Sequence, residues 1–149
     1  MALANNEIGV IQPIADIAKK INQIREDRKA RGIKLALYLH CDASQGAGLI
    51  DLNVSRLGVD MLTLNAGKIY GPKQVGLLWV NNDVPIKPII LGGGQESGNR
   101  SGTENVAGVM GFSVALELAE RRRKSEVKRL TLLRDFMQRK LTNHYPPLS

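Results

Sequence analysis

Apolar residues along the chain follow two spacings, one typical of helices and one typical of strands. Between residues 13 and 30, isoleucines and alanines recur every three or four positions, which predicts a helix with one apolar face. Pro13 suits the first turn of this helix, and a basic last turn before Gly32 predicts its end. Three short apolar runs predict strands, the first of them buried, at 35–39, 60–64 and 75–80.

The spacing becomes helical again from Glu104 onward. A basic run at 121–124 predicts a break, followed by a second amphipathic helix that ends at Pro146 and Pro147. The apolar residues 1–4 are typical of the end of a strand. Strands that alternate with helices predict an α/β fold, with a mostly parallel sheet, flanking helices and a long C-terminal helical segment.

Composition limits the class of protein. The chain has 149 residues, the size of one domain or of a piece of a larger one, and its 43% hydrophobic content suffices for an aliphatic core. The single cysteine, Cys41, excludes an intramolecular disulfide and is expected to be a small core residue. No apolar run approaches the roughly 20 residues that span a bilayer, and no secretion signal is recognisable. We therefore expect a cytoplasmic protein without a membrane partner.

The net charge of +7 raises the question of nucleic-acid binding. Much of this charge lies at 19–34 and 121–140, where acidic residues are interleaved and aromatic residues for base stacking are scarce. Such a mixed pattern is typical of a solvated helix face. The sequence therefore disfavours a nucleic-acid partner.

One lysine follows a predicted strand. After the strand at 60–64 come the small residues Asn65, Ala66 and Gly67, and then Lys68. Ligands of open α/β sheets bind at the carboxyl ends of strands, and an amine at a dry edge becomes a nucleophile toward carbonyls. The alternative is a surface lysine in a hairpin loop.

Other polar residues also follow predicted strands. Asp42 comes directly after the buried strand, where a carboxylate can cap a helix or pair with a cationic ring nitrogen. Gln45 and Asn6 can donate hydrogen bonds to a ring oxygen. Together with Lys68, these residues predict a site for a heteroaromatic cofactor that acts as an electron sink.

A glycine-rich stretch at 92–105 contains Arg100, Ser101 and Thr103. Glycines let backbone amides approach an anion, and the arginine and hydroxyl groups favour phosphate. The alternative is a flexible loop in which Ser101 or Thr103 caps the following helix.

The two histidines, His40 and His144, are far apart in sequence and predict no metal site.

Four motifs in order resemble the middle of a cysteine desulfurase of the class V aminotransferase superfamily: NNEIGVIQPI, HCDASQGAG, GVDMLTLNAGKIYGPKQVGLLWV and GGGQESGNRSGTEN. The resemblance covers about residues 2–120. It implies the central part of the large domain of a fold-type-I enzyme that uses pyridoxal 5'-phosphate. By this resemblance, residues 1–120 are a partial cofactor-binding domain, and 121–149 lead toward a small domain.

The resemblance also implies a role for each motif residue. Lys68 matches the catalytic Schiff-base lysine, and Asp42 matches the aspartate that pairs with the pyridine nitrogen. Gln45 and Asn6 match residues that bond the ring-oxygen side. Thr103 matches a threonine that, in homodimers formed through the large domain, reaches the phosphate of the neighbouring subunit's cofactor. The implied reaction converts L-cysteine to L-alanine and passes the sulfur to an enzyme cysteine and then to an acceptor protein, for iron–sulfur cluster or thiolated-RNA synthesis.

The chain departs from the family pattern at one motif. Many members have Ser-x-His-Lys where this chain has Asn65-Ala66-Gly67-Lys68; Asn65 retains one hydrogen-bonding group, whereas Gly67 has no side chain. The family's N-terminal phosphate loop and its persulfide cysteine have no counterpart in the sequence, and Cys41 adjoins Asp42 instead. We therefore expect a fragment that is inactive alone. The alternatives are a non-catalytic interaction or structural remnant of the fold and, less favoured, an anion or nucleic-acid binding module.

Overall fold

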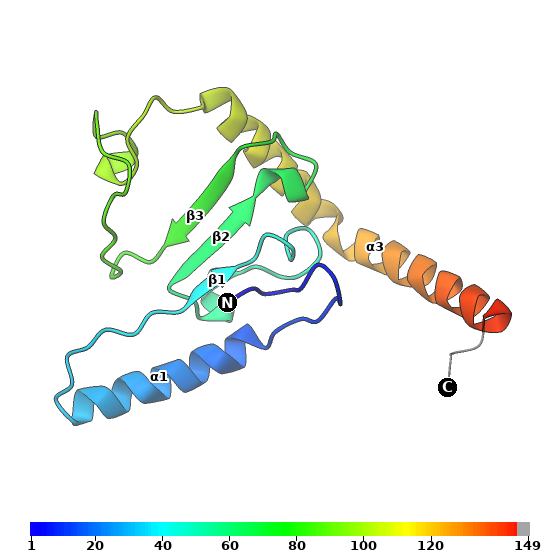
Figure 1. Ribbon diagram of the computed structural model, residues 1–149, viewed down its shortest axis with the longest axis horizontal. Coiled ribbons are helices and arrows are strands. Elements are labelled where there is room, and N and C mark those ends of the chain that lie inside the picture. The colour runs from blue at the N-terminus through cyan, green and yellow to red at the C-terminus, as the bar shows by residue number, and fades with distance from the viewer. Residues whose placement is uncertain (146–149) are drawn as a thin grey trace.

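The computed structural model describes residues 1–145 as an α/β arrangement with a long C-terminal helix (Figure 1). Pro146 and Pro147, which were predicted to end that helix, lie outside the described residues. The elements in chain order are α1 (Ile14–Ala30), β1 (His40–Asp42), α2 (Val54–Leu57), β2 (Met61–Asn65), the 3-10 turn η1 (Ala66–Lys68), β3 (Gly76–Val80), the 3-10 turn η2 (Glu96–Gly98) and α3 (Val106–His144).

The three strands form one mixed sheet in the order β1-β2-β3. β1 and β2 are parallel, with Asp42 opposite Thr63, whereas β3 runs antiparallel to β2. The N-terminal segment joins the other side of β1 through a parallel bridge between Ala2 and Asp42. The α/β prediction is confirmed, and the antiparallel direction of β3 follows from the loop at 66–75, which turns the chain back beside β2.

The predicted buried strand at 35–39 is wrong for most of its length. β1 begins only at His40, and Leu35 is exposed. In the register of the β1–β2 ladder, residues 35–38 would need 56–59 as their strand partner, but that stretch contains the end of α2 and the left-handed Gly58. Arginine side chains of α1 bond the free carbonyls instead, with Arg28 Nη1 3.2 Å from the Leu35 oxygen.

The predicted break at 121–124 is also wrong, because α3 continues through it as one helix of 39 residues. Arginine and lysine are good helix formers, and no glycine or proline occurs between 112 and 144. Ion pairs one turn apart support the helix across this stretch, including Glu117–Arg121 and Glu120–Arg123. The helix therefore continues past the basic run, although its contacts with the core end before it.

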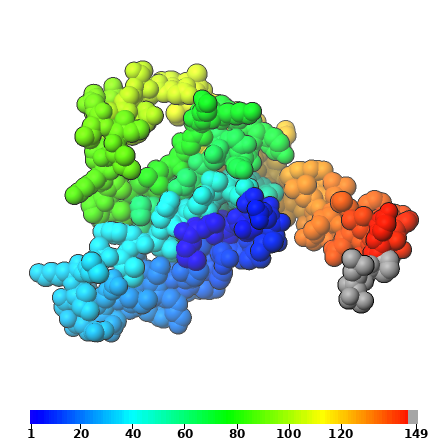
Figure 2. All heavy atoms as spheres, viewed as in Figure 1, coloured from blue at the N-terminus to red at the C-terminus, as the bar shows by residue number. Residues whose placement is uncertain are grey.

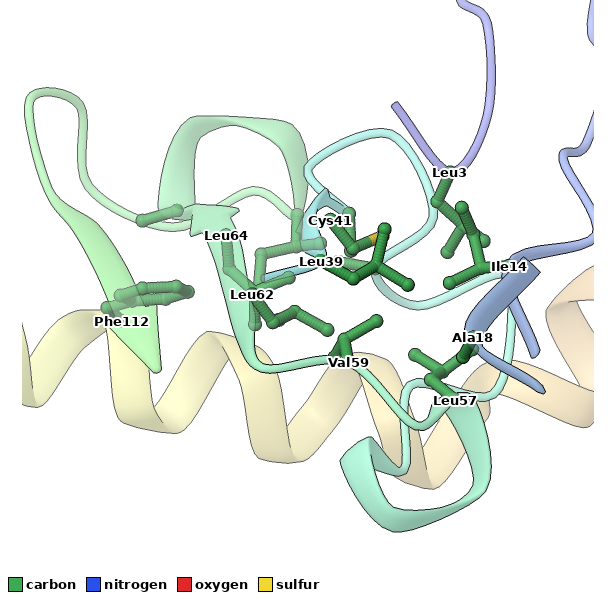
Figure 3. Packing of buried hydrophobic residues seen from close by; sticks show 14 of the residues in the cluster. Leu3, Ile14, Ala18, Leu39, Cys41, Leu57, Val59, Leu62, Leu64 and Phe112 are labelled. Carbon is green, nitrogen blue, oxygen red and sulfur yellow. The ribbon is translucent and has the colours of Figure 1, made fainter. Parts of the chain in front are cut away.

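The core lies on one face of the sheet (Figure 3). Cys41, Leu62 and Leu64 alternate with more exposed neighbours, so the buried side chains of β1 and β2 share a face. α1 contributes Ile14 and α3 contributes Phe112 to the same cluster. Cys41 is a fully buried core residue as predicted, and burial raises the pKa of its thiol, which keeps it protonated and unreactive.

Small residues let the first half of α3 approach the sheet closely. A methyl group added at Gly111 would stand 2.9 Å from Pro72 Cγ, and one added at Gly71 would stand 3.1 Å from Ala115 Cβ. Further along, a methyl group at Gly48 would stand 3.1 Å from Ala119 Cβ. The helix therefore presses directly on the loop that connects β2 to β3.

Beyond Ala119, α3 extends away from the body, as Figures 1 and 2 show. Its apolar side chains there are partly exposed, among them Leu132, Phe136 and Met137. Within the described part of the chain, none of the helices combines the length and apolar character needed to cross a membrane.

An ion pair joins α1 to the start of β2. The Arg25 guanidinium contacts the Asp60 carboxylate, and the two side chains are only 30% and 13% exposed. Asp60 Oδ2 also accepts the backbone N–H of Leu39 at 2.6 Å, while Arg25 donates to the Leu37 oxygen. This network holds the chain in place just before β1 and β2 begin.

Replacing Asp60 with alanine is expected to lower the free energy of unfolding by about 3 kcal/mol, because it leaves the Arg25 charge and the Leu39 N–H without their partner. Asp51→Ala is the matched control, since its pair with Arg56 is far more exposed and should contribute much less to stability. Urea denaturation measures both, and equal losses would contradict the role of the Asp60 network.

Gly111→Leu is expected to destabilise the chain by about 1–3 kcal/mol, because the side chain would overlap Pro72. The same change should speed amide hydrogen exchange in residues 66–75, which α3 covers. Ala107→Leu, at an exposed position on the same helix, serves as the control and should change stability by no more than about 0.5 kcal/mol. Unchanged exchange in Gly111→Leu would show that α3 does not hold this loop.

Candidate functional site

Three parallel segments end at the same edge of the sheet. The N-terminal segment, β1 and β2 run in one direction, and a turn follows each of them. These turns and strand ends place five of the residues selected from the sequence along one edge. They are Asn6, Asp42, Gln45, Asn65 and Lys68.

The loop that carries Lys68 is held by its own backbone. The Ala66 carbonyl accepts hydrogen bonds from the N–H groups of Ile69 at 3.1 Å and Gly71 at 2.9 Å, and the Ala66 N–H donates to Val75. Ala66, the first residue of η1, and Ile69, which follows it, are buried, whereas Lys68 is exposed. The fold thus anchors the apolar residues of the turn and leaves the amine free to meet a ligand.

The sequence predicted that a dry environment would activate Lys68. In the structure the side chain is exposed, so burial does not supply that activation within residues 1–145. No salt bridge among the described residues engages Lys68 or Asp42 either. The edge therefore offers one amine and one carboxylate that are both open to a ligand.

Asp42 is the last residue of β1 and is exposed. Its Oδ1 accepts the backbone N–H of Ser44 at 3.0 Å, and this bond, with the Ser44 hydroxyl, holds the pKa of the carboxyl below its ordinary value of 3.8. The lowered folded pKa means that ionised Asp42 stabilises the fold above about pH 4 and loses this contribution as the pH falls through the lowered value. At neutral pH the group is an anion.

Asn6 and Gln45 lie in the turns after the two neighbouring segments. Asn6 is exposed, in a turn that Asn5 holds by accepting the N–H groups of Glu7 and Ile8. Gln45 is half-buried in the turn after β1. Both amides lie on the same edge as Asp42, and within residues 1–145 no hydrogen bond engages either side chain.

Asn65 is engaged with its own loop. Its Oδ1 accepts the backbone N–H of Gly67 at 2.9 Å, which caps η1. That bond occupies the Gly67 amide, so this loop does not offer it to an anion. The Oδ1 atom of Asn65 is therefore used within the turn itself.

Thr103 is not brought to this edge by any described contact. It is exposed in the segment between β3 and α3, which Figure 2 shows standing away from the sheet with an opening beside it. The cap of α3 is Asn105, whose Oδ1 accepts the Gly108 N–H, rather than Ser101 or Thr103. Ser101 is buried and bonds Gly94 within the loop.

Sequence analysis passed over two polar residues beside Asp42. His40 and Thr63 lie on the face of the sheet opposite the core, and His40 Nε2 stands 2.6 Å from Thr63 Oγ1. The signal for them is the period of two along each strand, which puts His40 on the same face as Asp42 and Thr63 on the same face as Asn65. We call these four residues the open-face polar group.

The arrangement suits an organic ligand better than a metal ion. Among the described residues, no three histidine, cysteine or acidic side chains come together as metal ligands. An anion at the end of one strand and an amine after the next can instead hold a cationic ring and an aldehyde carbon. The donor set at this edge therefore fits a pyridoxal-type cofactor.

Comparison with known proteins agrees with this fit. The profile of the aminotransferase class-V family matches residues 1–145. The chain is 48% identical over 132 residues to the cysteine desulfurase IscS 1 of Archaeoglobus fulgidus, covering 89% of this chain and 31% of that protein. It is 44% identical to the cysteine desulfurase IscS of Dictyoglomus turgidum, covering 93% of this chain and 32% of that protein. The chain thus spans about a third of the length of these relatives.

Solved structures show the same relationship. A NifS-like protein superposes with a TM-score of 0.80 at 39% identity, over 95% of this chain and 36% of that one. The NifS-like protein from Rickettsia africae superposes with a TM-score of 0.86 at 34% identity, over 97% of this chain and 37% of that one. The fold-type-I prediction is confirmed by these neighbours. By sequence and by fold, the chain belongs to the aminotransferase class-V family and corresponds to a partial segment of its cysteine desulfurase members.

Proposed function

We propose that this chain forms the central part of the cofactor-binding domain of a pyridoxal-phosphate-dependent cysteine desulfurase. One observation carries the proposal: Asp42 and Lys68 follow neighbouring parallel strands and lie at the same sheet edge, each free of a protein ion pair among the described residues. Similarity to cysteine desulfurases over about a third of their length supports it.

Lys68 and Asp42 have distinct roles in this proposal. Pyridoxal phosphate, when bound, supplies an aldehyde carbon for amines and a cationic ring that withdraws electrons from the substrate. Lys68 Nζ would hold the aldehyde carbon of the cofactor and, as an amine beside it, would move a proton at the substrate carbon. The Asp42 carboxylate holds the proton on the ring nitrogen, because an adjacent anion favours the charged form.

The neighbouring amides complete the contacts to the ring. We assign Gln45 and Asn6 to its oxygen side, where each can donate a hydrogen bond. Asn65 can donate through Nδ2, because only its Oδ1 is used in capping η1. The phosphate is held less well by this loop than by a Ser-x-His-Lys loop, since Gly67 has no side chain and its N–H is already bonded.

The wider assembly follows from the same proposal. Ala119 is the last core contact of α3, which supports residues 1–120 as the cofactor-binding part and the helix beyond as the path toward a small domain. We assign Thr103, which is exposed, to the phosphate of a neighbouring subunit's cofactor in a homodimer. Delivery of sulfur to an acceptor protein in the cytoplasm, for iron–sulfur cluster assembly, completes the proposed function.

Incubating the chain with pyridoxal phosphate, followed by borohydride reduction and peptide mapping, is expected to place the label on Lys68. Lys68→Ala should lose this label. Lys73→Ala, which removes an exposed lysine from the same loop, should keep it. Equal labelling of Lys68 and Lys73 would instead indicate unselective reaction of surface amines, as expected of a non-catalytic remnant.

Asp42→Asn is expected to weaken pyridoxal-phosphate binding about tenfold, because it replaces a charge-assisted hydrogen bond of about 1.5–3 kcal/mol with a neutral one. Binding is measured by the concentration of cofactor that half-saturates the Lys68 label. Asp83→Asn, at an exposed acidic residue after β3, is the control and should leave this concentration unchanged. Equal affinity of Asp42→Asn and the unchanged chain would remove Asp42 from the site.

A further inference from the structure

His40 and Asp42 lie on the same open face of the sheet. The two residues are separated by one position on β1, so their side chains share a face. Thr63 stands directly opposite Asp42 in the β1–β2 ladder, and its Oγ1 lies 2.6 Å from His40 Nε2. The three side chains therefore form a compact group across two parallel strands.

The bond to Thr63 gives His40 a defined orientation. Threonine is restricted at its first side-chain torsion, so its hydroxyl is a firm anchor. An imidazole bonded through one ring nitrogen has its orientation fixed by that bond. An exposed histidine is thus fixed to the neighbouring strand, on the face of the sheet that also carries Asp42.

Ser44 and the Met1 ammonium also lower the pKa of Asp42, but neither belongs to a strand of the sheet. The largest contributions to its lowered pKa come from the Ser44 backbone N–H and hydroxyl, and the charges of His40 and the Met1 ammonium act in the same direction. The Ser44 bonds are made by the chain that follows Asp42, whereas His40 and Thr63 belong to the sheet itself. Of the groups that lower the Asp42 pKa, His40 is therefore the titratable side chain that belongs to the sheet.

We propose that His40, anchored by Thr63, is a positioning residue for Asp42 on the open face of the sheet. The inference rests on the proposed role of Asp42 in holding a cationic ring nitrogen. It adds two residues, to which the resemblance gives no role, to the machinery of that site.

The test is an NMR titration of the Asp42 carboxyl in the full chain without cofactor. His40→Gln should raise the Asp42 pKa, because the charge of His40 is one of the causes that lower it. His40→Arg, which restores a positive charge, should bring the pKa back down. The Met1 ammonium is present in all variants, so its effect on the Asp42 pKa is common to them.

Two further variants separate the positioning of His40 from a general effect of mutation on the Asp42 pKa. Thr63→Val keeps the shape of the side chain but removes the anchor, so it should raise the Asp42 pKa by less than His40→Gln does. His144→Gln changes the only other histidine of the sequence, at the end of α3, and should leave the Asp42 pKa unchanged. If His40→Gln fails to fold, as judged by circular dichroism, the Thr63→Val titration decides.

An Asp42 pKa that does not move in His40→Gln, or that moves equally in His144→Gln, would overturn the inference. Labelling of Lys68 by pyridoxal phosphate in the unchanged chain separates this failure from failure of the proposed function. Labelled Lys68 with an unresponsive Asp42 would reject the role of His40 alone. A responsive Asp42 without labelling of Lys68 would uphold the His40–Asp42 relation and reject the cofactor site.

Discussion

The close approach of α3 to the β2–β3 loop is the constraint on which the candidate site depends. Glycine and alanine on the facing surfaces let the helix backbone press against residues 66–75. With Ala66 and Ile69 buried by this packing, the short turn between them has one exposed long side chain, Lys68. A wider spacing would leave the turn without support, and the position of the amine would no longer be defined.

The sheet divides the structural and chemical roles of the strands between its two faces. Alternate residues of β1 and β2 enter the core with α1 and α3, while the intervening residues carry the open-face polar group. Because strand side chains alternate with a period of two, the same short strands can supply both sets. Cys41 illustrates the division, since it lies next to Asp42 in sequence but on the buried face, where its thiol is inert.

Much of the fold could be predicted from local patterns. The helix at 14–30 and the strands at 61–65 and 76–80 lie where apolar spacing placed them. The errors at 35–39 and 121–124 have different physical origins. An apolar run needs a partner strand to become a strand, and that partner is a neighbour in space that a local pattern does not contain. The basic run at 121–124 consists of good helix formers, so it leaves the helical hydrogen bonds intact.

The family, the order of the motifs and the residue types at the strand ends could be recognised from the amino-acid sequence, because local composition and spacing encode them. Only the tertiary structure decided which of those residues share an edge, that Lys68 is exposed, and that Asn105 rather than Thr103 caps α3. It also brought His40 and Thr63 together from separate strands. Such pairings are set by strand register and helix packing, which arise from contacts between residues far apart in the chain.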